Sequence, residues 1–141
     1  MVGRDTGLDL PTAIAVAEAA DPRWGGLLLD VWHMNRGGIP YADFATIPPQ
    51  YIRHIELDDA DATLVGTIME DTTMRRKLPG DGDFDVPSFL AHIAATGYSG
   101  LYGVEILSDE HRSRSPALAA RMAFDATMRC FDRMPTLSLP S

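Results

Sequence analysis

Residues 24–30, WGGLLLD, decide the fold class, because they form a short apolar run that ends on a carboxylate. A run that is apolar on both faces is typical of a buried parallel strand. The same pattern returns at residues 51–57 and 101–106, each with an acidic side chain at or near its carboxyl end. We therefore expect three parallel strands that carry Asp30, Glu56 and Glu105.

Helical signals fill the intervals between these strands. Proline near a helix start, an Asp that can act as an N-cap and a glycine after the last helical residue are the signals that place the ends. They predict helices over residues 11–20, 41–45 and 86–96, and a last helix that begins at Ser115-Pro116. Residues 58–83 are expected to form one long loop. Helices that alternate with strands indicate a parallel α/β fold.

The composition excludes several classes of protein. The formal net charge of the 141 residues is −8 and the pI is about 4.7, which argues against a nucleic-acid partner. No stretch approaches the roughly 18 apolar residues that a membrane helix needs, and the N-terminus lacks a signal-peptide pattern, so we expect a cytoplasmic protein without a membrane partner. The single cysteine, Cys130, is expected to pack in the core.

The three strand-end acids are the candidate chemistry. The carboxyl ends of parallel strands meet at one edge of a sheet, where three carboxylates would repel one another without a compensating charge. A divalent cation, Mg²⁺ or Mn²⁺, supplies that charge, and the nearby imidazole of His33 would also suit Mn²⁺, Co²⁺ or Zn²⁺. The alternative is that such acids only cap helices or face solvent. Glu56 and Glu105 fit this alternative poorly because apolar residues flank both.

Four segments resemble motifs of the xylose isomerase-like TIM barrels, which include sugar phosphate isomerases/epimerases. Residues 26–33, GLLLDVWH, resemble the Asp-x-x-His segment, and residues 52–60, IRHIELDDA, are similar to the next strand motif. Residues 76–83, RKLPGDGD, resemble the Arg-x-x-Pro-Gly-x-Gly loop, and residues 97–106 resemble the last ligand strand. Their order and spacing agree with the family over about residues 7–131.

The resemblance implies a partial TIM (β/α)8 barrel, roughly its C-terminal half, over residues 1–134, followed by a loose tail, 135–141. It implies metal ligation by Asp30, Glu56 and Glu105, although many members carry His or Gln where Glu56 stands. The catalytic residues that it implies are Glu105 as base, His33 beside the substrate, and Arg76 opposite a developing oxyanion or a substrate anion. His54 is expected either to be packed or to contact a metal ligand rather than the metal, and Asp59 to be a loop acid.

The function implied is a metal-dependent isomerase or epimerase that transfers a proton next to a carbonyl of a sugar-like or cyclic polyol substrate. A dehydratase of the dehydroshikimate or inosose type is the alternative enzyme. A fourth ligand of the family, a Glu, would fall upstream of Met1, so a non-catalytic fragment is the alternative from another class. We also expect an uncovered inner face (Leu28, Ile55, Val104), and hence a homo-oligomer or molten behaviour.

Overall fold

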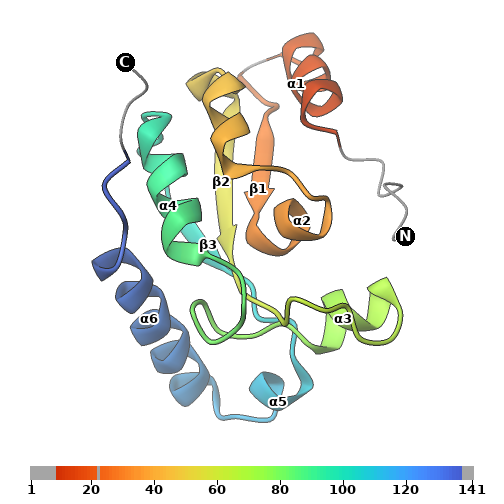
Figure 1. Ribbon diagram of the computed structural model, residues 1–141, viewed down its shortest axis with the longest axis vertical. Helices are drawn as coiled ribbons and strands as arrows, with labels where there is room; N and C mark the ends of the chain where they lie inside the picture. The colour runs from red at the N-terminus through yellow and green to blue at the C-terminus, as the bar shows by residue number, and fades with distance from the viewer. Residues whose placement is uncertain (1–8, 22, 138–141) are drawn as a thin grey trace.

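The computed structural model describes residues 9–21 and 23–137, which form a three-stranded parallel sheet with helices packed against it (Figure 1). The strands lie in the order β1 (Leu27–Asp30), β2 (Ile52–Leu57) and β3 (Tyr102–Val104). The helices are α1 (Leu10–Ala19), α2 (Val31–Arg36), α3 (Ile68–Met74), α4 (Val86–Ala95), α5 (Asp109–Arg112) and α6 (Pro116–Asp132), with 3₁₀ turns η1 (Tyr41–Thr46) and η2 (Pro49–Tyr51). The expected alternation of parallel strands and helices is thus present.

The pairing register divides the side chains of the sheet between two faces. Leu29 pairs with Ile55, which pairs in turn with Tyr102, and these side chains share one face. Asp30 pairs with Glu56 on the opposite face. The backbone N–H of Glu105 donates to the carbonyl of Leu57 at 3.1 Å, so the ladder continues one residue beyond β3. Alternation along the chain then places Glu105 on the same face as Asp30 and Glu56.

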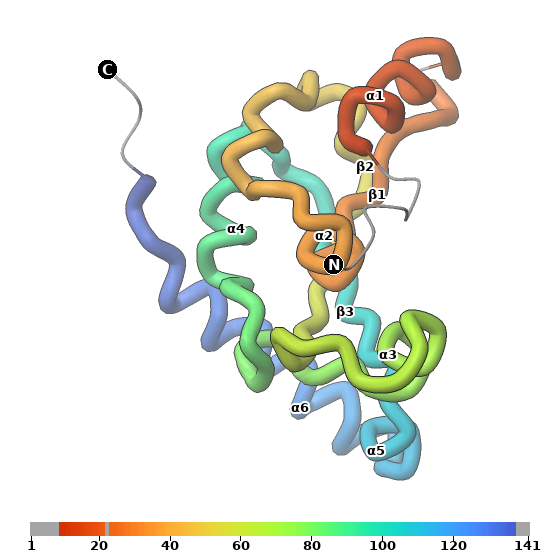
Figure 2. Tube along the Cα trace, turned by 45° about the vertical axis from the view of Figure 1, so that its right-hand side comes forward, coloured from red at the N-terminus to blue at the C-terminus, as the bar shows by residue number. Residues whose placement is uncertain are grey.

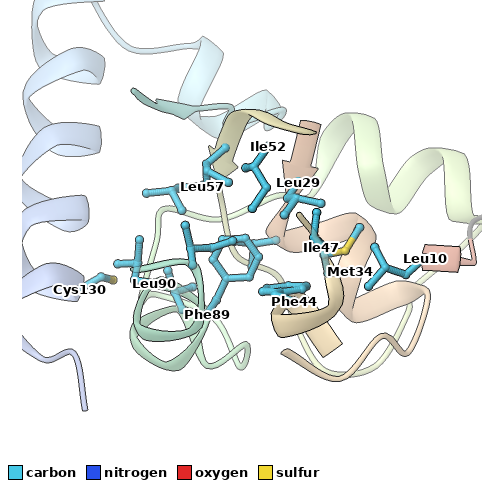
Figure 3. Packing of buried hydrophobic residues seen from close by; sticks show 14 residues of the cluster. Leu10, Leu29, Met34, Phe44, Ile47, Ile52, Leu57, Phe89, Leu90 and Cys130 are labelled. Atoms are coloured by element: carbon cyan, nitrogen blue, oxygen red, sulfur yellow. The ribbon is translucent and has the colours of Figure 1, made fainter. Parts of the chain in front are cut away.

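The hydrophobic core lies on the face that helices cover. Leu29, Ile55 and Leu57 are at most 2% exposed and belong to one cluster with Phe89 and Leu90 of α4. Figure 3 shows these leucines and Phe89 pointing into a shared interior with Phe44, and Cys130 of α6 at its edge. The expected packing of Cys130 is confirmed, since its side chain is 1% exposed. Burial also raises the pKa of its thiol.

The prediction for the opposite face is correct only in part. Leu28 lies on it and is 49% exposed, as expected for a side chain without an opposing wall. Ile55 was wrongly assigned, because it is fully buried on the covered face. Val104 was also wrongly assigned, because it pairs with Leu57 and so shares the face of Ile55. The face without cover therefore carries mainly polar side chains near the strand ends.

The segment predicted as one loop, residues 58–83, contains the helix α3. Thr67 caps it: the Thr67 hydroxyl accepts from the Glu70 N–H at 3.2 Å, and the Glu70 carboxylate accepts from the Thr67 N–H at 2.8 Å. This capping box satisfies backbone donors that a short helix otherwise leaves free. Figures 1 and 2 both place α3 and α5 beyond the carboxyl ends of the strands, the edge at which the acids lie.

A further difference between expectation and structure is the helix that follows β1. The short helix α2 was not predicted; it begins directly after β1, with Asp30 as its N-cap. None of the helices within the described ranges is both long and apolar enough to cross a membrane. Part of the predicted tail, residues 138–141, lies outside the described residues.

Candidate metal centre and active site

Asp30, Glu56 and Glu105 come together at the carboxyl ends of the three strands. Each offers one carboxylate oxygen, and the three oxygens lie within 4.8 Å of one another. Asp30 is buried, whereas the side chains of Glu56 and Glu105 are 23% and 41% exposed. The cluster therefore has a buried wall and an accessible side.

The two carboxylate oxygens of Asp30 make different contacts. Its Oδ1 accepts a hydrogen bond from the His33 N–H at 2.9 Å, which caps α2. Its Oδ2 remains for the site and lies 2.8 Å from Nη1 of Arg76. One carboxylate oxygen of Asp30 therefore caps α2, and the other lies in the acidic cluster.

Arg76 is the cation of the cluster. Its Nη1 lies 2.8 Å from Asp30, 2.5 Å from Asp58 and 3.1 Å from Oε2 of Glu105. Its Nε and Nη2 donate to the backbone carbonyl and the hydroxyl of Thr72. From the sequence we expected Arg76 opposite a substrate anion, but in the structure it is 3% exposed and compensates the protein's own carboxylates.

Asp58 belongs to the site, and sequence reasoning missed it. It is completely buried, and its Oδ1 has no hydrogen-bond partner among the described residues. Burial, and after it the charge of Asp30, raises the pKa of Asp58 to about 8, although Arg76 acts in the opposite direction. A signal was available in the sequence, because Asp58 follows Glu56 by two residues and alternation puts both on one face.

The donor set fits a divalent cation. Burial raises the pKa of Glu56, and the neighbouring charges of Glu105 and then Asp30 raise it further. Such mutual repulsion is relieved by a bound cation. Three carboxylate oxygens from separate strands are hard ligands of the kind that Mg²⁺ and Mn²⁺ prefer. The cluster can therefore hold a divalent metal with its open side toward solvent.

Of the two candidate histidines, only His54 has a side-chain contact with an acid of the cluster among the described residues. His33 is on α2, is exposed, and packs at 4.9 Å, edge to face, on Trp32. His54 is on β2, with its Nε2 3.9 Å from Glu56. Neither belongs to the group of three possible metal ligands found within the described ranges.

Asp59 organises the loop that connects β2 to α4. Its carboxylate accepts hydrogen bonds from the N–H groups of Gly80, Gly82 and Phe84, each at 3.0 Å, and from Ala60 at 2.8 Å. Gly80 has φ +83°, and a Cβ at Gly82 would collide with the Asp59 carboxylate. The Pro-Gly-x-Gly motif is thus a backbone nest around Asp59, which holds the chain between Arg76 and α4 in place.

Two enzymes are similar to this chain in sequence. Over 89 residues the chain is 34% identical to the 3-dehydroshikimate dehydratase of Pseudomonas aeruginosa, an alignment that covers 62% of this chain and 14% of that enzyme. Over 125 residues it is 27% identical to the inosose isomerase of Halalkalibacterium halodurans, covering 89% of this chain and 43% of that enzyme. The chain thus spans less than half the length of these relatives.

Solved structures agree on the fold. A crystal structure of the IOLI protein with a bound zinc atom superimposes with a TM-score of 0.68 at 22% identity, covering 79% of this chain and 39% of that one. A fusion protein of a xylose isomerase-like TIM barrel and 4-hydroxyphenylpyruvate dioxygenase superimposes with a TM-score of 0.66 at 31% identity, covering 82% and 18%. The profile of the xylose isomerase-like TIM barrels matches residues 2–131. The chain belongs to this family, as its motifs predicted, and its three parallel strands are part of such a barrel.

Proposed function

We propose that the protein is a metal-dependent isomerase or epimerase that moves a proton next to a carbonyl of a sugar-like or cyclic polyol substrate. The observation that carries the proposal is the convergence of three carboxylate oxygens within 4.8 Å at the strand ends. The inosose isomerase among the relatives supports this class of reaction. The 34% identity to a 3-dehydroshikimate dehydratase favours a dehydratase as the second candidate.

The three acids would hold the metal, each with one oxygen. A divalent ion bound there would polarise a substrate carbonyl and so acidify the adjacent C–H bond. Arg76 would keep the buried side of the cluster compensated, since its Nη1 contacts both Asp30 and Asp58.

Glu105 is our candidate for the base. Its side chain is the most accessible of the three acids, at 41% exposed, so it can reach a substrate from the open side. A carboxylate within hydrogen-bond reach of an acidified C–H can accept the proton at an oxygen. His33, exposed one turn after Asp30, would exchange a proton with a substrate oxygen at the rim of the site.

Both candidate reactions begin with this proton abstraction and differ in the next step. In an isomerase or epimerase, a proton returns to carbon, whereas in a dehydratase the same electron pair expels a neighbouring hydroxyl, which takes up the abstracted proton and leaves as water. Incubation of the Mn²⁺-loaded protein in D₂O with an inosose or with 3-dehydroshikimate, followed by NMR, separates the outcomes. Deuterium at the carbon beside the carbonyl supports the isomerase, and a new conjugated alkene supports the dehydratase. Neither change with either compound, or equal turnover by Glu105→Gln, would contradict the proposal.

A further inference from the structure

The helix α3 is attached to the molecule in an unusual way. Asp71 is its only buried residue, at 2% exposed, while its apolar Ile68, Met69 and Met74 are 44%, 64% and 49% exposed. Helices normally attach to a fold by burying an apolar stripe. Because α3 keeps its apolar side chains in solvent, its position depends on polar contacts.

Arg112 of α5 donates two exposed hydrogen bonds to the Thr73 carbonyl, at 3.1 Å each, whereas the buried polar contacts of α3 lead to α2. Oδ2 of Asp71 accepts hydrogen bonds from the indole Nε1–H of Trp32 at 2.8 Å and from Nε of Arg36 at 2.9 Å. All three side chains are at most 9% exposed, so the ion pair is shielded from water. Hydrogen bonds that involve charge in such surroundings are among the stronger ones in proteins. The carboxylate of Asp71 therefore fixes α3 to α2, the helix that Asp30 caps.

Two routes connect this anchor to the candidate site. Thr72, the next residue on α3, accepts hydrogen bonds from Nε and Nη2 of Arg76 at 3.1 and 2.9 Å. The ring of Trp32 also lies 5.4 Å from the guanidinium carbon of Arg76, within the range of a cation–π contact. The ion pairs of this guanidinium with the acids of the site all go through the single atom Nη1. The orientation of its other two nitrogens therefore depends on α3.

We propose that Asp71 is a positioning residue: by holding α3 against Trp32 and Arg36 of α2, it fixes the guanidinium of Arg76 against the carboxylate cluster. Asp71 touches none of these carboxylates and acts only through Thr72 and Trp32. The functional meaning of this positioning rests on the function proposed above, whereas the coupling between Asp71 and Arg76 is a property of the chain itself.

The coupling is tested by NMR on the ¹⁵N-labelled chain. The signals to follow are the indole N–H of Trp32 and the Nε–H of Arg76, with the indole N–H of Trp24, which is 86% exposed, as internal reference. In Asp71→Ala both signals should shift, and the Nε–H of Arg76 should exchange with solvent about tenfold faster or more, the factor that loss of one charge-assisted hydrogen bond produces. Met69→Ala alters the exposed side of α3 and should leave both signals unchanged.

Asp71→Asn is the conservative variant. It keeps an acceptor for Trp32 but loses the ion pair with Arg36. The Nε–H of Arg76 should therefore exchange with solvent at a rate between the rates of the wild type and of Asp71→Ala. Asp71→Asn also tests the coupling between Asp71 and Arg76 if Asp71→Ala does not fold. The proposal would be overturned if the Nε–H of Arg76 had the same chemical shift and exchange rate in Asp71→Asn as in Met69→Ala. This holds even if the indole signal of Trp32 is displaced in Asp71→Asn. Failure of the metal function would instead appear as absence of Mn²⁺ binding in the wild type, with the Arg76 exchange of the Asp71 variants still raised.

Discussion

At the scale of single residues, the guanidinium of Arg76 decides how the acids of the site can coexist. It contacts Asp30 and Asp58, both of which are buried, and Glu105, which is partly exposed. A buried carboxylate without a counter-charge costs several kcal/mol or takes up a proton. Arg76 therefore stabilises the same cluster that we propose binds metal, and the stability and chemistry of the site share one side chain.

Replacement of Arg76 by Met is expected to lower the free energy of unfolding by about 3–5 kcal/mol, because it leaves the buried acidic groups of Asp30 and Asp58 without their shared partner. Urea denaturation at neutral pH measures this. Arg75→Met is the matched control, since the Arg75 side chain is 43% exposed and lies 3.9 Å from Asp61, so a change within about 0.5 kcal/mol is expected. Equal effects of the two substitutions would show that the ion pairs of Arg76 do not stabilise the fold.

Asp58 predicts a pH dependence in the metal-free protein. Its pKa is raised from the ordinary value of 3.8 to about 8 in the folded state. The folded chain therefore holds a proton that the unfolded chain releases, and the free energy of unfolding falls as pH rises from 3.8 to about 8. In Asp58→Asn the free energy of unfolding should fall less steeply with pH over this range. Asp61→Asn should not, because the pKa of Asp61 is lowered and it titrates below this window. The comparison uses urea denaturation from pH 5 to pH 8 with a chelator, and identical slopes in wild type and Asp58→Asn would refute the assignment.

At the scale of elements, apolar runs and helix caps were sufficient to predict the main strands and helices. Strand–helix alternation alone predicts that Asp30, Glu56 and Glu105 meet at one edge of the sheet. The helix α2 was missed because it follows β1 without a linker residue. The helix α3 was missed because its apolar residues do not form a buried stripe, and its anchor, the bond from Asp71 to Trp32, spans 39 residues of sequence. The contact of Arg76 with Asp30 also joins residues that are far apart in the sequence. For this reason the role of Arg76 as a counter-ion was not predicted.

The cap of α3 gives a prediction at this scale. Thr67→Ala removes the hydroxyl that accepts from Glu70 N–H, and the cost of losing such a cap is about 1 kcal/mol. Amide hydrogen exchange within residues 68–74 should become faster while exchange in α4 stays as in the wild type. Thr73→Ala is the control, because the Thr73 hydroxyl only donates to the Met69 carbonyl inside the same helix. Faster exchange of the same size in both variants would show that the capping box has no special part in holding α3.

At the scale of the whole molecule, apolar side chains on a strand, on α6 and in two connections are not covered by the described residues. Trp24, Leu101 and Phe124 are 86%, 82% and 64% exposed, and Leu28 lies half exposed on the face opposite the core. We expect the 141-residue chain to self-associate or to bind an apolar dye. Phe124→Asn should reduce either effect, and Arg121→Asn, an exposed change on the same helix, should not. Light scattering and dye fluorescence that show a monomer without dye binding would contradict this expectation.

The most direct measurement is a calorimetric titration of the chain with Mn²⁺. The wild type should bind one ion, and Asp30→Ala and Glu105→Ala should abolish binding, because each removes one of the three oxygens that lie within 4.8 Å. Asp61→Ala should bind as the wild type does, since Asp61 lies outside that group and pairs with Lys77. Equal affinity in all four proteins, or no binding by the wild type, would contradict the metal centre.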